Sequence, residues 1–156
     1  ICTGLLLRQT PVAGDLRFVS AALKIVSDME RIGDQAADIA ELSRYISEKP
    51  LLEKVHISDI CCVVMNMVTD SVEALVKKDE ILARKVIGDD IADELFVRIK
   101  EELVSLIQEN RTEPQEILDL LMAAKYFERV GDHAVNIAEW VEFIVTGMHD
   151  DRECGH

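Results

Sequence analysis

The sequence predicts an all-α fold of three-helix bundles in tandem repeat, with the first bundle incomplete. Apolar residues recur at steps of three and four along the chain, and no stretch alternates between apolar and polar residues as a strand would. Helix breakers are rare, with 3 prolines and 7 glycines in 156 residues. The segment ERIGDQAADIAE at 30–41 also returns as ERVGDHAVNIAE at 128–139. The chain therefore contains two copies of one helical unit.

Prolines and changes in periodicity set the limits of the predicted helices. Pro11 and Pro114 stand near the starts of the two helices that contain the repeat, and Pro50 follows the end of the first of them. In chain order, the predicted helices are about 1–8, 12–48, 57–78, 80–109 and 114–147, followed by a tail without periodicity from Met148.

The repeat also predicts how the chain is divided. Residues 51–156 hold a complete three-helix unit plus the tail, whereas residues 1–50 hold only the last helix of the first unit and the end of the helix before it. A single amphipathic helix cannot bury its apolar stripe alone. We therefore expect helix 12–48 to pack on the second unit or on another copy of the chain, which favours a homodimer or a higher assembly.

Charge and composition exclude several classes of partner. The formal net charge of -13 argues against nucleic acid and anionic membranes, and it agrees with binding of cations or of a basic protein surface. No segment has the run of apolar residues that a membrane span needs, and signal-peptide features are missing, so no membrane insertion is expected. The 4 cysteines show neither zinc spacing nor a disulfide framework. We expect a cytoplasmic protein with reduced thiols.

Each copy of the repeat places carboxylates on one stripe of its helix. In the first copy, Glu30, Asp34, Asp38 and Glu41 fall at roughly 0°, 40°, 80° and 20° around the helix axis. The apolar residues of this helix centre on its other side, and they are Ile25, Met29, Ile32, Ala36 and Ile39. The equivalent positions in the second copy are Glu128, Asp132, Asn136 and Glu139.

Two interpretations of these stripes remain open. A solvated acidic face is the simpler one, but like charges one turn apart destabilise a helix by roughly 0.2–0.5 kcal/mol per pair. No Lys or Arg offsets the first stripe. Carboxylates one turn apart can share a hard cation, and this removes the repulsion. Metal binding is therefore the favoured interpretation.

Gly33 and Gly131 occupy equivalent places inside the two helices. A glycine in mid-helix costs roughly 1 kcal/mol relative to alanine. Both lie at the edge of the apolar arc, so we expect each to admit another helix at close range.

Three stretches together resemble the PhoU family, regulators of bacterial phosphate uptake. They are RQTPVAGDLR at 8–17, the ERIGD and ERVGD cores of the repeat, and DDIADELFVRIKEEL at 89–103. The resemblance implies two similar three-helix bundles whose E(D)xxxD motifs bind metal clusters, commonly of iron or zinc.

Carried over by position, the motif falls on three pairs, with Asp38 and Asn136 extending two of them: Glu30 with Asp34, Asp89 with Asp93, and Glu128 with Asp132. We expect Asp89 and Asp93 to lie one turn apart on one helix face, opposite Glu128 and Asp132. The helix that would face Glu30 and Asp34 is missing from the first unit. A complete metal site is therefore expected only on the second unit.

The resemblance further implies a cytoplasmic adaptor, not an enzyme, that acts as a negative regulator of phosphate uptake and of phosphate-starvation signalling. Its implied partners are the ATPase subunit of the phosphate transporter and the sensor histidine kinase.

Two alternatives remain from other classes: a ferritin-like di-iron carboxylate enzyme and a metal-free structural bundle. Di-iron sites need Glu-x-x-His pairs on core helices. The matching letters, Glu53 with His56 and Glu153 with His156, fall in a predicted linker and in the tail, so we expect these histidines to be exposed polar residues and not ligands. His133 follows Asp132 in sequence but points about 100° away around the helix. No nucleophile, phosphate loop or other catalytic arrangement is apparent.

Overall fold

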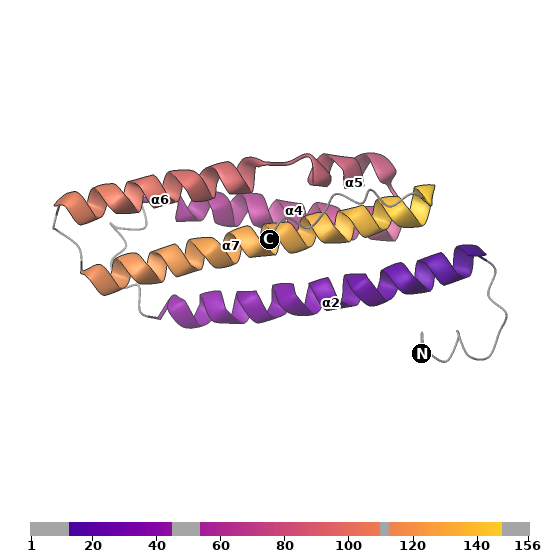
Figure 1. The fold of residues 1–156 in the computed structure, drawn as a ribbon, viewed down its shortest axis with the longest axis horizontal. Coiled ribbons are helices and arrows are strands. Elements are labelled where there is room, and N and C mark those ends of the chain that lie inside the picture. Colours follow the sequence, from indigo (N-terminus) through magenta and orange to yellow (C-terminus); the bar gives the residue numbers. More distant parts are fainter. Residues whose placement is uncertain (1–12, 45–53, 110–112, 148–156) are drawn as a thin grey trace.

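The computed structural model describes residues 13–44, 54–109 and 113–147, and these form an elongated, all-α arrangement without strands (Figure 1). Its elements are α2 (Ala13–Leu42), α4 (Ile57–Lys77), α5 (Glu80–Ile87), α6 (Ile91–Glu109) and α7 (Pro114–Thr146). This confirms the predicted fold class. The predicted helix over 1–8 and the tail from Met148 lie outside the described residues.

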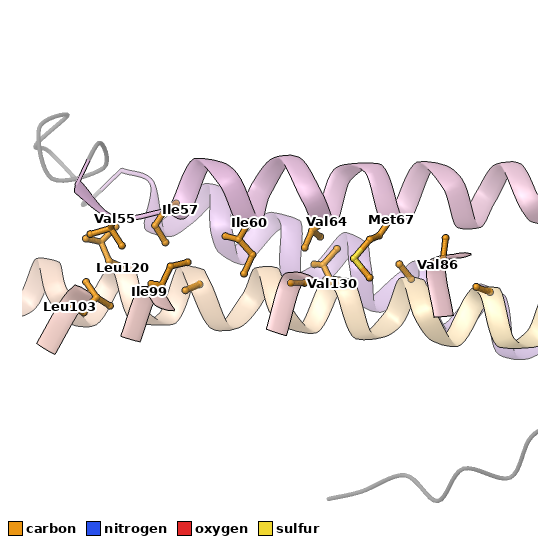
Figure 2. Close-up of a cluster of buried hydrophobic side chains, with 14 of the residues drawn as sticks. Val55, Ile57, Ile60, Val64, Met67, Val86, Ile99, Leu103, Leu120 and Val130 are labelled. Atoms are coloured by element: carbon orange, nitrogen blue, oxygen red, sulfur yellow. The ribbon is translucent and has the colours of Figure 1, made fainter. Parts of the chain in front are cut away.

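The long helix α7 is the centre of the fold. It packs against α4, α5 and α6 on one side, and α2 runs beside it in the opposite direction on the other (Figure 1). Figure 2 shows the core of the second unit, where apolar side chains such as Ile60, Ile99 and Leu120 meet between α4, α6 and α7. Helix α2 therefore packs on the second unit, which was one of the two arrangements predicted.

Capping residues explain where most of the helices end. Helix α4 ends because Lys78 adopts the left-handed conformation with φ 54°. Asp79 then caps α5 by accepting a hydrogen bond from Leu82 N at 3.0 Å. At the start of α7, Pro114 occupies the first turn, and Gly147 with φ 80° follows its end. These limits agree with the predictions for α4 and α7.

The prediction of one continuous helix over 80–109 is wrong. Helix α5 ends at Ile87 and α6 begins at Ile91. Gly88 terminates α5, and the Asp89 carboxylate accepts a hydrogen bond from Ile91 N at 3.1 Å. Aspartate offers the backbone an alternative to helical bonding in this way, so the Gly-Asp-Asp sequence interrupts an apolar periodicity that continues on both sides.

Helix α2 is shorter than predicted, and its inward face contains only part of the predicted apolar set. It spans Ala13–Leu42, with a turn at 43–44, and residues 45–48 of the prediction lie outside the described part. Ile25 is buried, whereas Met29 and Ala36, which were expected on the same apolar face, are exposed. The buried side of α2 is the side that meets α7.

The two glycines of the repeat have different surroundings. A Cβ atom at Gly131 would lie 3.5 Å from Ala92 Cβ and 3.7 Å from both Met67 Sδ and Val64 Cγ2, so α7 approaches α4 and α6 closely there. At Gly33 a Cβ would meet no other atom within 4 Å in the described structure. The prediction of close helix packing is thus confirmed at Gly131 and wrong at Gly33.

Candidate metal centre

Four of the predicted ligands line one groove of about 350 Å³ beside α7. Glu128 and Asp132 come from α7, Asp93 from the first turn of α6, and Asp89 from the linker before it. Asn136 lines the same groove. The fold therefore brings together these five of the eight predicted residues.

The local structure explains how each element contributes. Glu128, Asp132 and Asn136 follow one another at four-residue steps, so they lie along one face of α7. Asp93 lies in α6, but Asp89 precedes that helix. The expectation that Asp89 and Asp93 lie one turn apart on a single helix face is therefore wrong. Asp89 reaches the groove from the Asx turn that starts α6.

The carboxylates of the groove repel one another. The pKa of Asp132 is raised, first by partial burial against the groove walls and then by the charges of Glu128 and Asp93. The pKa of Asp93 is raised for the same first reason, with Glu128 and Asp90 adding to the effect. Lys125 opposes both shifts. The groove thus concentrates negative charge in a partly desolvated place.

Lys125 is a neighbour that the sequence analysis overlooked. It forms an ion pair with Glu128 three residues later, and its ammonium group lies 5.1 Å from the centre of the Phe96 ring. The i,i+3 spacing on a helix would have been enough to find this pair. Asp90 also lines the groove, and only one of its five carboxylates forms an ion pair with this lysine, so an excess of negative charge remains.

The donor atoms of the groove fit a hard cation, which prefers carboxylate and amide oxygens. Neither histidine nor cysteine lines the groove. Across 13–44, 54–109 and 113–147, no three His, Cys, Asp or Glu side chains are already gathered closely enough to hold a metal ion. Binding would therefore require the carboxylates to turn toward a shared point.

The first copy of the motif lies elsewhere. Glu30, Asp34 and Asp38 are exposed on α2, and none of them lines the acidic groove. The structure therefore separates the first copy of the motif from the acidic groove.

Asp28 is the polar residue that the sequence analysis missed. It is only 7% exposed, on the face of α2 that meets α7. Its Oδ1 accepts a hydrogen bond from Asn136 Nδ2 at 3.2 Å and lies 2.9 Å from His133 Nδ1. The available signal was its position between Ile25 and Ile32, at the three- and four-residue steps of a buried stripe.

His56, which matched the di-iron sequence pattern, contacts a neighbouring helix. His56 directly precedes α4, and its Nδ1 lies 2.6 Å from Glu102 Oε1 on α6. It was expected to be an exposed polar residue, whereas it is partly buried against a neighbouring helix. Glu53, Glu153 and His156 lie outside the described residues.

A second groove, of about 310 Å³, is apolar and lies between α2, α4 and α7. Ile32 and Ile39 of α2 face Val64 and Val68 of α4 across it, with Phe127 contributed by α7. Within the described residues, no helix combines the length and apolar character of a membrane span.

Comparison with known proteins identifies relatives. The PhoU domain matches residues 1–43 and 57–141. A phosphate-specific transport system accessory protein PhoU homolog of Aquifex aeolicus (strain VF5) is 38% identical over 130 residues, which are 82% of this chain and 59% of that protein. A homolog of the same description from Clostridium acetobutylicum is 35% identical and covers 93% of this chain and 67% of its own length. The chain thus spans about three fifths to two thirds of these relatives.

Solved structures have the same fold. The crystal structure of PhoU from Pseudomonas aeruginosa superposes with a TM-score of 0.87 at 33% identity, covering 94% of this chain and 72% of that one. The crystal structure of the phosphate transport system regulatory protein PhoU from Streptococcus pneumoniae gives a TM-score of 0.83 at 24% identity, covering 96% of this chain and 71% of that one. At that lower identity the likeness concerns the fold alone.

Proposed function

The chain belongs to the PhoU family, and we propose that it is a regulatory accessory protein of phosphate transport that binds metal ions in its acidic groove. The observation behind the metal proposal is that Asp89, Asp93, Glu128 and Asp132 line one groove. The raised pKa values of Asp93 and Asp132 support it, because each is raised in part by neighbouring carboxylates. Iron or zinc is the metal that we propose, by family resemblance.

A cation in the groove would be bound from two sides. Glu128 and Asp132 would bind it from α7, and Asp89 and Asp93 would bind it from the α6 side. A bound cation would supply positive charge, which offsets the repulsion among these carboxylates. Lys125 would have to release Glu128 before that carboxylate could become a ligand.

The regulatory part of the proposal concerns protein partners. We propose a cytoplasmic adaptor that dampens phosphate uptake and phosphate-starvation signalling by contact with the transporter ATPase subunit and the sensor histidine kinase. The descriptions of the relatives as accessory proteins of phosphate-specific transport support this role. The strong negative charge of the chain favours a basic surface on such a partner.

The test of metal binding is elemental analysis of the purified protein before and after chelation. The variant Asp93→Asn with Asp132→Asn should lose stoichiometric metal and keep its helicity. A matched control, Glu30→Gln with Asp34→Asn, removes the same charge from the exposed stripe of α2 and should retain the metal. Equal metal content in the wild type and the groove variant would contradict the proposal.

A second experiment separates the adaptor from a di-iron enzyme. After anaerobic loading with ferrous iron, we expect no sustained oxygen consumption, since neither histidine nor cysteine lines the groove. Catalytic oxygen consumption that Glu128→Gln abolishes would favour the enzyme instead.

A further inference from the structure

We propose that Asp28 of α2 is a positioning residue for the metal groove: it holds the amide of Asn136 so that Asn136 Oδ1 is available as a ligand. This inference rests on the proposed metal binding. Asn136 connects Asp28 with the groove, because it lines the groove and also donates a hydrogen bond from Nδ2 to Asp28 Oδ1 at 3.2 Å.

The chemistry of the two side chains fixes which way the amide points. An ionised carboxylate only accepts hydrogen bonds, whereas an amide group has one accepting oxygen and one donating nitrogen. The atom of Asn136 that meets Asp28 must therefore be Nδ2. Its Oδ1 is then the atom left for the groove.

Asp28 is well placed to hold this orientation. It is buried, with 7% of its surface exposed, and the same Oδ1 also lies 2.9 Å from His133 Nδ1. Two side-chain nitrogens of α7 thus converge on one carboxylate oxygen of α2, and this restricts both partners. Loss of both partners would leave a buried carboxylate without hydrogen bonds, and this would strongly destabilise the folded protein. The contact should therefore persist in the folded state.

The repeat supplies independent support. The residue equivalent to Asn136 in the first copy is Asp38, which is exposed on α2. An aspartate at 136 would instead place a second carboxyl group within hydrogen-bond distance of Asp28, and the pair would have to either repel each other or take up a proton. The replacement of Asp by Asn in the second copy therefore has a physical reason, and it keeps an oxygen donor on the groove.

The consequence is a link between the two copies of the repeat. The polar residues of the groove come from the α5–α6 linker, α6 and α7, whereas Asp28 belongs to α2. A cation on Asn136 Oδ1 would polarise the amide and strengthen its donation to Asp28. Metal binding and the docking of α2 on α7 would then stabilise each other.

The first readout needs no metal. In the metal-free protein, the Asn136 side-chain amide signals, assigned through their loss in Asn136→Asp, should show slow hydrogen exchange. The substitution Asp28→Ala should accelerate this exchange, and Asp28→Asn should preserve it, because the new amide oxygen still accepts. Unchanged exchange in Asp28→Ala would overturn the proposed orientation.

The second readout is metal affinity, with Mn²⁺ and Zn²⁺ as probes. Asp28→Ala and Asn136→Ala should each lower the affinity roughly 10–100-fold, as removal of a residue that orients a ligand does. The double variant should lose no more than either single variant, because Asp28 acts through Asn136. Losses that multiply would mean that Asp28 acts only on general stability, and the inference would be wrong.

An exchange of the two side chains gives a rescue test. Asn136→Asp alone should weaken the packing of α2, whereas Asp28→Asn combined with Asn136→Asp restores one amide facing one carboxylate and should recover the wild-type affinity or exceed it. Glu30→Ala, an exposed carboxylate of the same helix, is the control and should change nothing. If the wild type binds neither probe, the proposed function and this inference fall together; if it binds them and the exchange does not rescue, only the inference falls.

Discussion

The two copies of the repeat have nearly the same residues on α2 and α7 but different surroundings. On α7, Gly131 approaches α4 and α6 closely, and Glu128 and Asp132 face a groove. On α2, Gly33 meets open space and Glu30 is exposed. One local sequence thus forms the same helix twice, but it contributes to the acidic groove only where α6 lies opposite. The candidate site is a property of the packing and not of the motif alone.

The two copies should differ most in how much stability a core substitution removes. Ile137 is fully buried on α7, whereas its repeat counterpart Ile39 is only partly buried beside the apolar groove. We expect Ile137→Ala to lower the free energy of unfolding by about 2–5 kcal/mol, and Ile39→Ala to lower it by less than half as much. Urea unfolding at one fixed protein concentration measures both. Equal losses would show that α2 is as tightly packed as α7.

The exposed apolar residues of α2 predict self-association. Val26 is 62% exposed, whereas its counterpart Ala124 on α7 is buried. Burial of a valine contributes about 1.5–3 kcal/mol, so Val26→Lys should weaken an assembly that covers it at least about tenfold. Light scattering over a dilution series tests this. Val104→Lys on α6 is the matched control, since Val104 is 52% exposed. A wild type that remains monomeric at all concentrations would contradict the prediction.

Gly33 should tolerate a side chain without cost. It lies inside α2 with space around it, so Gly33→Ala should stabilise the protein by up to about 1 kcal/mol through helix propensity. At Gly131, a leucine would have to displace Ala92, Met67 or Val64, and we expect Gly131→Leu to destabilise by about 1–3 kcal/mol. Thermal unfolding separates the two. Destabilisation by Gly33→Ala would mean that another chain covers this face of α2.

The sequence predicted the helical class, the limits of α4 and α7 and four groove carboxylates, because periodicity and repeats are local signals. It did not predict the break at 88–90, since the apolar spacing continues across it while the aspartates cap the next helix. It also missed Asp28. The spacing of Asp28 from its apolar neighbours indicates burial, but nothing in the sequence indicates that this carboxylate will meet two side-chain nitrogens that lie more than a hundred residues later on α7. Contacts between distant segments depend on the tertiary arrangement.

The smallest expected effect concerns the charge of Asp132. Its pKa is raised above the ordinary 3.8 in the folded protein, so the folded state binds this proton more tightly than the unfolded state does. Between pH 3.8 and the raised pKa, stability therefore falls as the pH rises. Above that window Asp132 is charged in both states and the full penalty remains.

Asp132→Asn should accordingly stabilise the metal-free protein at pH 7 by less than about 1 kcal/mol, since solvent screens a carboxylate at the groove rim. The gain should vanish near pH 3, where the wild-type carboxyl group is protonated in both states. Urea unfolding with a chelator at both pH values measures this, with Asp34→Asn on α2 as the control of equal charge change. Saturating metal should reverse the sign, because the wild type then gains stability that the variant cannot. A variant less stable than the wild type at pH 7 without metal would show that Asp132 is held by favourable contacts, and that repulsion in the groove does not favour a cation.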